Sequence, residues 1–184
     1  MDVPRKTDKN YFKFMAGIFL CLVVRLIPLR APNIEPILAT AMPFSKHYGA
    51  FAGFSFAVLS ILLYDILTAT LGIHTFFTVG AYGAIGLYSA VYFKKRTASA
   101  WNFVRFAVVS TIFFDAVTGL TLGPIFFEQS FLVALVGQIP FTLLHLIGNV
   151  AFAAVLSPAI YKFLVRKRKR ESETSINLLN PKLI

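Results

Sequence analysis

The stretch Phe56–Thr68 reads Phe-Ala-Val-Leu-Ser-Ile-Leu-Leu-Tyr-Asp-Ile-Leu-Thr and is apolar almost throughout, apart from one carboxylate, Asp65. A similar stretch returns at Phe106–Thr118, which reads Phe-Ala-Val-Val-Ser-Thr-Ile-Phe-Phe-Asp-Ala-Val-Thr and carries Asp115 at the matching place. An ionisable group inside a membrane-crossing helix costs about 2.5–3.5 kcal/mol on insertion scales, so it usually faces the helix bundle or a wet cavity. Two such groups in equivalent positions predict a polar site within a helix bundle.

The composition is typical of a membrane protein. Of the 184 residues, 57% are hydrophobic and only 14% are charged, whereas soluble domains contain about 25% charged residues. The apolar residues form runs of about 20, which is the length of helix that crosses the core of a bilayer. We therefore predict an all-α integral membrane protein with one domain. The single cysteine, Cys21, lies in an apolar run, which excludes disulfides within the chain and thiolate metal sites.

The positions of the charges predict the topology. The net charge of +10 comes from basic residues at the ends of apolar runs: before the first (Arg5–Lys13), after the fourth (Lys94–Arg96) and after the last (Lys162–Arg170). Short loops rich in Lys and Arg stay in the cytoplasm. We therefore expect a multi-pass protein of the cell membrane with both termini in the cytoplasm, and no nucleic-acid partner.

Apolar runs and helix breakers predict a six-helix transmembrane domain over residues 11–165, between cytoplasmic tails at 1–10 and 166–184. The expected spans are about Tyr11–Pro28, Ile37–Lys46, Gly49–Leu71, Phe76–Phe93, Asn102–Leu122 and Pro140–Val165. The second is short, and we interpret it as strained or partly re-entrant. The C-terminal tail is basic, then polar, and expected to be disordered.

Two segments leave alternatives open. Phe131–Ile139 is either a re-entrant or lid segment or the start of a sixth helix bent at Pro140. The first apolar run has the pattern of a signal peptide with Ala39-Thr-Ala41 as its cleavage site. Arg25 and Arg30 lie between that run and the site, which favours a retained helix.

Small residues and aromatic residues predict further contacts. Gly49 and Gly53, four apart, and the series Gly80, Gly83 and Gly86 are typical of faces where membrane helices approach closely. Trp101 and Phe103 lie among basic residues, as expected of aromatic residues at the membrane interface.

Asp65 and Asp115 are the main candidates for a binding site. Each either contacts a ligand, pairs with Arg25, or caps a helix end at the Thr-rich turn that follows. Carboxylate pairs also act as acid and base in hydrolases. Because no nucleophile with a nearby base is apparent, we predict that the protein is not an enzyme.

His145 and Asn149 are four residues apart and share one helix face. They either contact a ligand or form a polar pair that bonds across the bundle. No second His or Cys stands at metal-ligand spacing on that helix, so no metal site is predicted. The chain also contains no Gly-x-x-x-x-Gly-Lys-Ser/Thr nucleotide loop, so neither an ATPase nor a cofactor is expected.

An ordered set of motifs resembles the membrane S components of energy-coupling-factor (ECF) vitamin transporters. The motifs are Arg25-Leu-Ile-Pro28, Pro32-Asn33-Ile-Glu-Pro36, the Gly-rich third run that leads to Asp65, and Pro140-Phe-Thr-Leu-Leu-His145-Leu-Ile-Gly148-Asn149. The likeness covers about Lys13–Val165.

The resemblance implies an ABC-type importer subunit that captures a vitamin at the outer face and delivers it inward with a transmembrane coupling subunit and two ATPase subunits. The residues expected to line or frame its pocket are Asn33, Glu35, Asp65, Asp115, His145 and Asn149. Phe76, Phe126 and Phe127 are expected to close over it, with His74 and Glu128 as further outer-loop candidates. In such proteins small residues of the first helix meet the coupling subunit, and the nearest match here is Gly17-x-x-x-Cys21.

Three other functions fit the same sequence. The first is a stand-alone secondary transporter or small channel that uses Asp65 and Asp115 to carry protons. The second is a membrane enzyme acting on lipids or isoprenoids. The third is a purely structural membrane partner without a small-molecule ligand.

Overall fold

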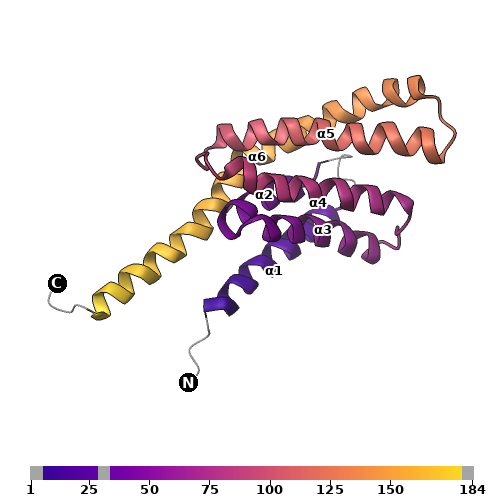
Figure 1. The fold of residues 1–184 in the computed structure, drawn as a ribbon. Coiled ribbons are helices and arrows are strands. Elements are labelled where there is room, and N and C mark those ends of the chain that lie inside the picture. Colours follow the sequence, from indigo (N-terminus) through magenta and orange to yellow (C-terminus); the bar gives the residue numbers. More distant parts are fainter. Residues whose placement is uncertain (1–5, 29–33, 180–184) are drawn as a thin grey trace.

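The computed structural model describes residues 6–28 and 34–179, and this part of the chain contains helices and no strands (Figure 1). The helices are α1 (Lys6–Arg25), α2 (Ile37–Tyr48), α3 (Ala50–Leu67), α4 (Ile73–Phe93), α5 (Ala100–Phe126) and α6 (Phe131–Leu179). The predicted all-α class is confirmed over these residues.

Four of the helices are long and apolar enough to cross a membrane: α3, α4, α5 and the Phe131–Val165 part of α6. A helix of 12 residues such as α2 is only about 18 Å long, which is well short of a bilayer core of about 30 Å. The structure therefore confirms a multi-pass membrane protein with four candidate spans, while six spans remain a prediction.

The short helix α2 lies at the centre of the molecule. Nine consecutive residues, Ile37–Ser45, are buried, and α2 contacts all five other helices. Pro43 has no N–H to bond to the carbonyl of Ala39. The Ser157 hydroxyl of α6 donates to that carbonyl at 2.7 Å instead. Helix α6 thus supplies the hydrogen bond that Pro43 cannot make, and α2 is a short buried helix. A re-entrant path for this segment stays a prediction.

The helices after α2 run alternately up and down. Figure 1 shows the α3–α4 and α5–α6 connections at one end of the molecule and the α4–α5 connection at the other. The start of α1 and the end of α6 both project from the end that carries the α4–α5 connection. Because α3 and α5 run in the same direction, their aspartates lie toward the same end of the bundle.

The sequence repeat is also a structural repeat. Phe56 and Phe106 are both buried, as are Asp65 and Asp115. The hydroxyls of the matching threonines, 68 and 118, each donate to the carbonyl four residues earlier, both at 2.8 Å.

The two copies then diverge. Helix α3 ends at Leu67, where Ala69 takes a left-handed conformation with φ of 55°. Helix α5 continues to Phe126 through Pro124. The predicted ends were therefore both wrong: α3 stops before Leu71, and α5 continues beyond Leu122. Helix α4 also begins at Ile73, before the predicted Phe76.

Gly53 and Gly86 mark the closest approach of α3 and α4. A Cβ on Gly53 would lie 2.6 Å from the carbonyl oxygen of Gly86, and one on Gly86 would lie 2.5 Å from that of Gly53. Gly83 also faces α3, since a Cβ there would lie 2.9 Å from the Phe54 ring. The predictions for Gly49 and Gly80 were wrong: Gly49 lies between α2 and α3 with φ of 99°, and a Cβ on either glycine would meet nothing within 4 Å.

Other expectations for the helices also change. Phe131–Ile139 is the first part of α6, so it is the start of the sixth helix, as one alternative had it. Helix α6 also remains helical from 166 to 179, where a disordered tail was predicted. Phe103 is fully buried and Trp101 is exposed, so only the tryptophan can reach an interface.

The residues expected to dock a coupling subunit pack inside the molecule. Cys21 is buried, and a Cβ on Gly17 would meet the rings of Phe44 and Phe56 at 3.0–3.1 Å. The nearest match to the small-residue motif, Gly17-x-x-x-Cys21, therefore packs against α2 and α3 of its own chain. The exposed face of α1 carries larger side chains, including Met15 and Phe19.

Candidate functional site

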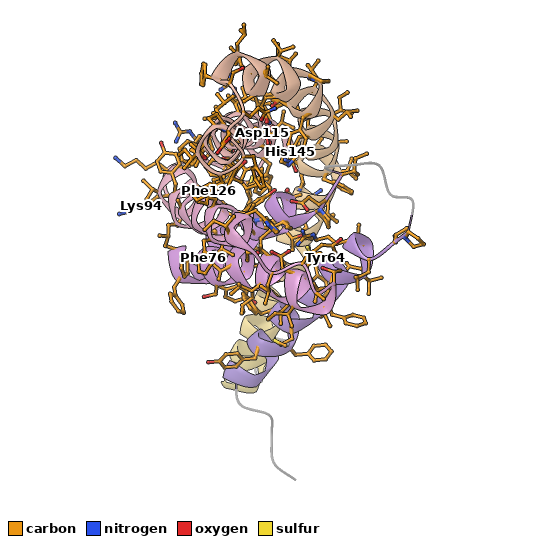
Figure 2. The ribbon with its side chains drawn as sticks, turned by 90° about the vertical axis from the view of Figure 1, so that its right-hand side faces the viewer. Tyr64, Phe76, Lys94, Asp115, Phe126 and His145 are labelled. Carbon is orange, nitrogen blue, oxygen red and sulfur yellow. The ribbon has the colours of Figure 1, made fainter. Side chains whose placement is uncertain are left out.

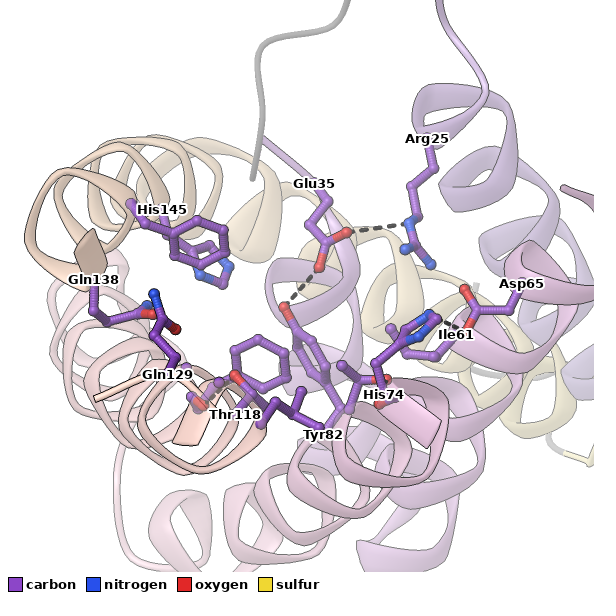
Figure 3. Close-up of a pocket in the computed structure, with 16 residues that line it drawn as sticks. Arg25, Glu35, Ile61, Asp65, His74, Tyr82, Thr118, Gln129, Gln138 and His145 are labelled. Atoms are coloured by element: carbon purple, nitrogen blue, oxygen red, sulfur yellow. Dashed lines mark hydrogen bonds and ion pairs between the residues drawn. The ribbon is translucent and has the colours of Figure 1, made fainter. Parts of the chain in front are cut away.

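A cavity of about 460 Å³ opens at the end of the bundle where the α3–α4 and α5–α6 connections lie. Its walls come from the end of α1, the segment before α2, and one end each of α3, α4, α5 and α6. Figure 2 looks onto this end of the molecule, and Figure 3 shows the lining side chains. Charged groups line one side, amide groups and a histidine line the other, and Tyr82 lies between them.

The charged side is built around Glu35. Arg25 Nε lies 3.1 Å from Glu35 Oε2, and the Tyr82 hydroxyl donates to Glu35 Oε1 at 2.8 Å. The Arg25 guanidinium also donates to the carbonyl of Ser60 at 2.9 Å and lies 3.8 Å above the centre of the Tyr64 ring. These contacts tie the end of α1 to α3, α4 and the start of α2. One predicted alternative paired Arg25 with Asp65 or Asp115, but its partner in the structure is Glu35.

Asp65 lines the cavity and also supports the start of α4. It is 5% exposed, and its Oδ2 accepts a hydrogen bond from the Thr75 hydroxyl at 2.6 Å. The Thr75 oxygen in turn accepts the backbone N–H of Gly72 at 3.2 Å, as in a capped helix start. His74 Nε2 lies 4.0 Å from the same carboxylate oxygen. Asp65 therefore has two roles. It supports a capped helix end, as one predicted alternative had it, and it forms part of the cavity wall.

Asp115 and His145 form a buried pair between α5 and α6. His145 Nδ1 lies 2.8 Å from Asp115 Oδ1, and the two residues are 1% and 2% exposed. One turn further along both helices, Asn149 donates to the Thr111 hydroxyl at 2.8 Å. Three atoms of this polar ladder have no hydrogen-bond partner among the described residues: Asp115 Oδ2, His145 Nε2 and Asn149 Oδ1.

Two glutamines close the amide side of the cavity. Gln138 of α6 and Gln129 of the α5–α6 connection lie against Gly119 and Gly123 of α5, where a Cβ would collide with the glutamine side-chain oxygens. The absence of side chains at these glycines thus makes room for polar groups. Gln138 lies seven residues, about two helical turns, before His145, and this spacing in an apolar run could have identified it.

The predicted site residues divide into three groups. Glu35, Asp65 and His145 line the cavity, and so does His74. Asp115 and Asn149 lie behind His145 and do not line it, and Asn33 lies outside the described residues. The three aromatic residues that were expected to close over the pocket, Phe76, Phe126 and Phe127, are exposed, as is Glu128, and none of them lines the cavity in this structure.

Tyr82 is the contact that links the cavity floor to its charged side. Replacing it with phenylalanine removes the hydrogen bond to Glu35, which remains buried. Hydrogen bonds to charged groups contribute about 1.5–3 kcal/mol, so we expect Tyr82→Phe to lower the free energy of unfolding by that amount. Thermal unfolding in detergent measures this loss, with Tyr88→Phe on the exposed side of α4 as the control. Equal losses in the two variants would contradict the prediction.

The described residues contain no group of three or more His, Cys, Asp and Glu side chains arranged to hold a metal ion. What the cavity offers is a set of hydrogen-bonding groups on an aromatic floor, where the Tyr82 and Phe114 ring centres lie 4.4 Å apart. No protein-family model matches the chain, and no curated protein matches it in sequence.

Proposed function

We propose that this protein is the substrate-capture subunit of an ECF-type ABC importer, which binds a vitamin or similar micronutrient at the outer face of the cell membrane. The observation that carries the proposal is the cavity itself. Its volume of about 460 Å³ lies within the range of about 300–1,000 Å³ that is usual for small-molecule sites. Polar side chains from the ends of several membrane helices converge on it, as the sequence resemblance implies.

The arrangement of charges supports an outward-facing cavity. The basic segment Lys94–Arg96 follows α4 at the end of the bundle opposite the cavity. Lys- and Arg-rich loops favour the cytoplasmic side, so the cavity end faces outward in this proposal. The same orientation puts both termini in the cytoplasm. Together with the four long helices, α1 and α2 complete the proposed six-helix transmembrane unit.

In this proposal the protein performs no covalent chemistry. It binds its substrate and delivers it inward with a transmembrane coupling subunit and two ATPase subunits, because no nucleotide loop is present in its own sequence. The substrate would contact Asp65 and His145, while Asp115 and Asn149 hold the α5–α6 wall behind them.

A second candidate is a stand-alone proton-coupled transporter. The observation that favours it is the buried Asp115–His145 pair, in which Asp115 Oδ2 and His145 Nε2 have no partner among the described residues. Chains of Asp, Glu and His within membrane proteins often carry protons. Proton-driven uptake into liposomes that contain only this protein would establish this function instead.

The test of the capture function is a bound molecule. Native mass spectrometry of the protein, purified in mild detergent from its own cells, is expected to show one vitamin-sized mass. Asp65→Asn should lose that mass, because the carboxylate lines the cavity, whereas Glu128→Gln, an exposed acidic residue outside it, should keep it. A ligand-free spectrum that stays unchanged after a panel of vitamins is added would contradict the proposal.

A further inference from the structure

The pattern of hydrogen bonds in the cavity wall identifies a chemical class of ligand, and this inference rests on the proposed capture function. We propose that the cavity selects a small, flat, nitrogen-rich organic cation, such as an amidinium or an amino-substituted heteroaromatic ring. The selection comes from three properties of the wall: its free hydrogen-bond acceptors, its unbalanced negative charge and its aromatic floor.

The hydroxyl groups of the wall have already donated their protons to the protein. The Tyr82 hydroxyl donates to Glu35 at 2.8 Å, and the Thr118 hydroxyl donates to the carbonyl of Phe114, also at 2.8 Å. The Thr78 hydroxyl donates to carbonyls of its own helix at 3.1 Å. A hydroxyl has one donor and two acceptor positions, so these three oxygens can offer a ligand only lone pairs.

The histidine of the wall is also held as an acceptor. An ionised Asp115 accepts a hydrogen bond from His145 Nδ1, so that nitrogen carries the proton. In the neutral ring the other nitrogen, Nε2, then carries a lone pair, and it has no partner among the described residues. Asp115 is thus a positioning residue that sets the polarity of the His145 ring.

The charges that line the cavity do not cancel. Arg25 pairs with Glu35 at 3.1 Å, whereas the basic group that comes within 4.0 Å of Asp65 in the described structure is the half-exposed imidazole of His74. With neutral histidines, one guanidinium and two carboxylates leave one negative charge in the wall. Since this charge lies in a partly buried site, it favours a ligand with one positive charge.

The floor of the cavity is aromatic and suits a flat ligand. The rings of Tyr82 and Phe114 lie 4.4 Å apart between centres, and Phe141 lies beside His145 on the opposite wall. A cation over an aromatic face is attracted electrostatically by the ring. Figure 3 shows Tyr82 between the acidic group around Asp65 and the amide group of Gln129 and Gln138, so a ring lying on the floor would reach both.

Three probes of nearly the same shape test this inference on the purified full chain in nanodiscs. Benzamidinium carries one positive charge and four N–H donors, benzamide is its neutral counterpart, and benzoate is its anionic counterpart. Isothermal titration calorimetry should show benzamidinium binding at least tenfold more tightly than benzamide, with no measurable binding of benzoate. Benzoate binding as tightly as benzamidinium would overturn the inference, and this comparison needs no variant.

A charge-removing variant locates the effect. Asp65→Asn keeps an oxygen that can accept the Thr75 hydroxyl, so the α3–α4 turn should remain folded, and thermal unfolding checks this. The variant should bind benzamidinium about tenfold more weakly and benzamide within twofold of the wild type. Glu128→Gln is the control and should change neither. Unchanged benzamidinium affinity in Asp65→Asn would overturn the role of this carboxylate.

The ligand class and the capture function can fail separately. If an anionic molecule co-purifies with the protein and is taken up with a coupling subunit, the ligand class is wrong and the capture function stands. If benzamidinium shows the expected preference but no coupling subunit associates with the protein, the capture function is wrong and the cation site stands.

Discussion

Replacing His145 with leucine is expected to lower the free energy of unfolding by about 3 kcal/mol, because it leaves a buried carboxylate without its hydrogen-bond partner, and an unsatisfied buried group costs about 1–3 kcal/mol or more when it is charged. Asp115 is 1% exposed and its Oδ1 lies 2.8 Å from His145 Nδ1. Its other oxygen has no partner in the described structure, so the carboxylate in His145→Leu would lose its one hydrogen bond.

Unfolding in detergent with increasing denaturant measures the loss. The matched control is His74→Leu, whose side chain is 49% exposed and lies 4.0 Å from its carboxylate, and a change below about 1 kcal/mol is expected there. The double variant Asp115→Leu/His145→Leu should recover much of the stability, because apolar residues of similar volume often replace a buried pair without loss. A stable His145→Leu protein would show that Asp115 is not held as an anion.

The repeat indicates how far the sequence alone determines the site. It predicted that Asp65 and Asp115 occupy equivalent buried helix positions, and they do. It could not predict that the two carboxylates have different partners. That difference arises because Ala69 ends α3 with φ of 55°, a conformation that alanine seldom takes, while the matching Gly119 continues as helix.

The predicted second span illustrates a limit of hydropathy. An apolar run signals burial away from water, but it does not say whether lipid or protein surrounds it. Helix α2 is 12 residues long and contacts all five other helices, so its apolar residues belong to the protein core. Hydropathy together with length would have shown that this run does not reach across a bilayer by itself.

The cavity was only partly predictable, for a related reason. Isolated acidic residues and histidines are conspicuous in apolar runs, so Asp65 and His145 were found. Tyr82 and Gln138 do not stand out in the sequence in this way, because their roles depend on the side chains that other helices place opposite them. The sequence contains several carboxylates that are possible partners for Arg25. Glu35 is its partner because the fold places this residue, just before α2, beside the guanidinium.

The second large effect is expected at the crossing of α3 and α4. Gly86→Val should lower the free energy of unfolding by about 3 kcal/mol, at the upper end of the usual cost of overpacking. A Cβ at this position would lie 2.5 Å from the carbonyl oxygen of Gly53 and 2.8 Å from the backbone nitrogen of Phe54. Because both obstacles are backbone atoms, no side-chain rotation can relieve the collision, and the helices must separate.

Separation of these helices should also disturb the cavity, because α3 and α4 supply Asp65, His74 and Tyr82. Gly86→Val is therefore expected to lose both thermal stability and benzamidinium binding. Gly80→Val is the matched control on the same helix, since a Cβ on this exposed glycine meets nothing within 4 Å, and surface changes are usually within about 0.5 kcal/mol. Equal stability of the two variants would mean that the Gly53–Gly86 contact does not hold α3 against α4. Other contacts would then have to position Asp65, His74 and Tyr82 in the cavity wall.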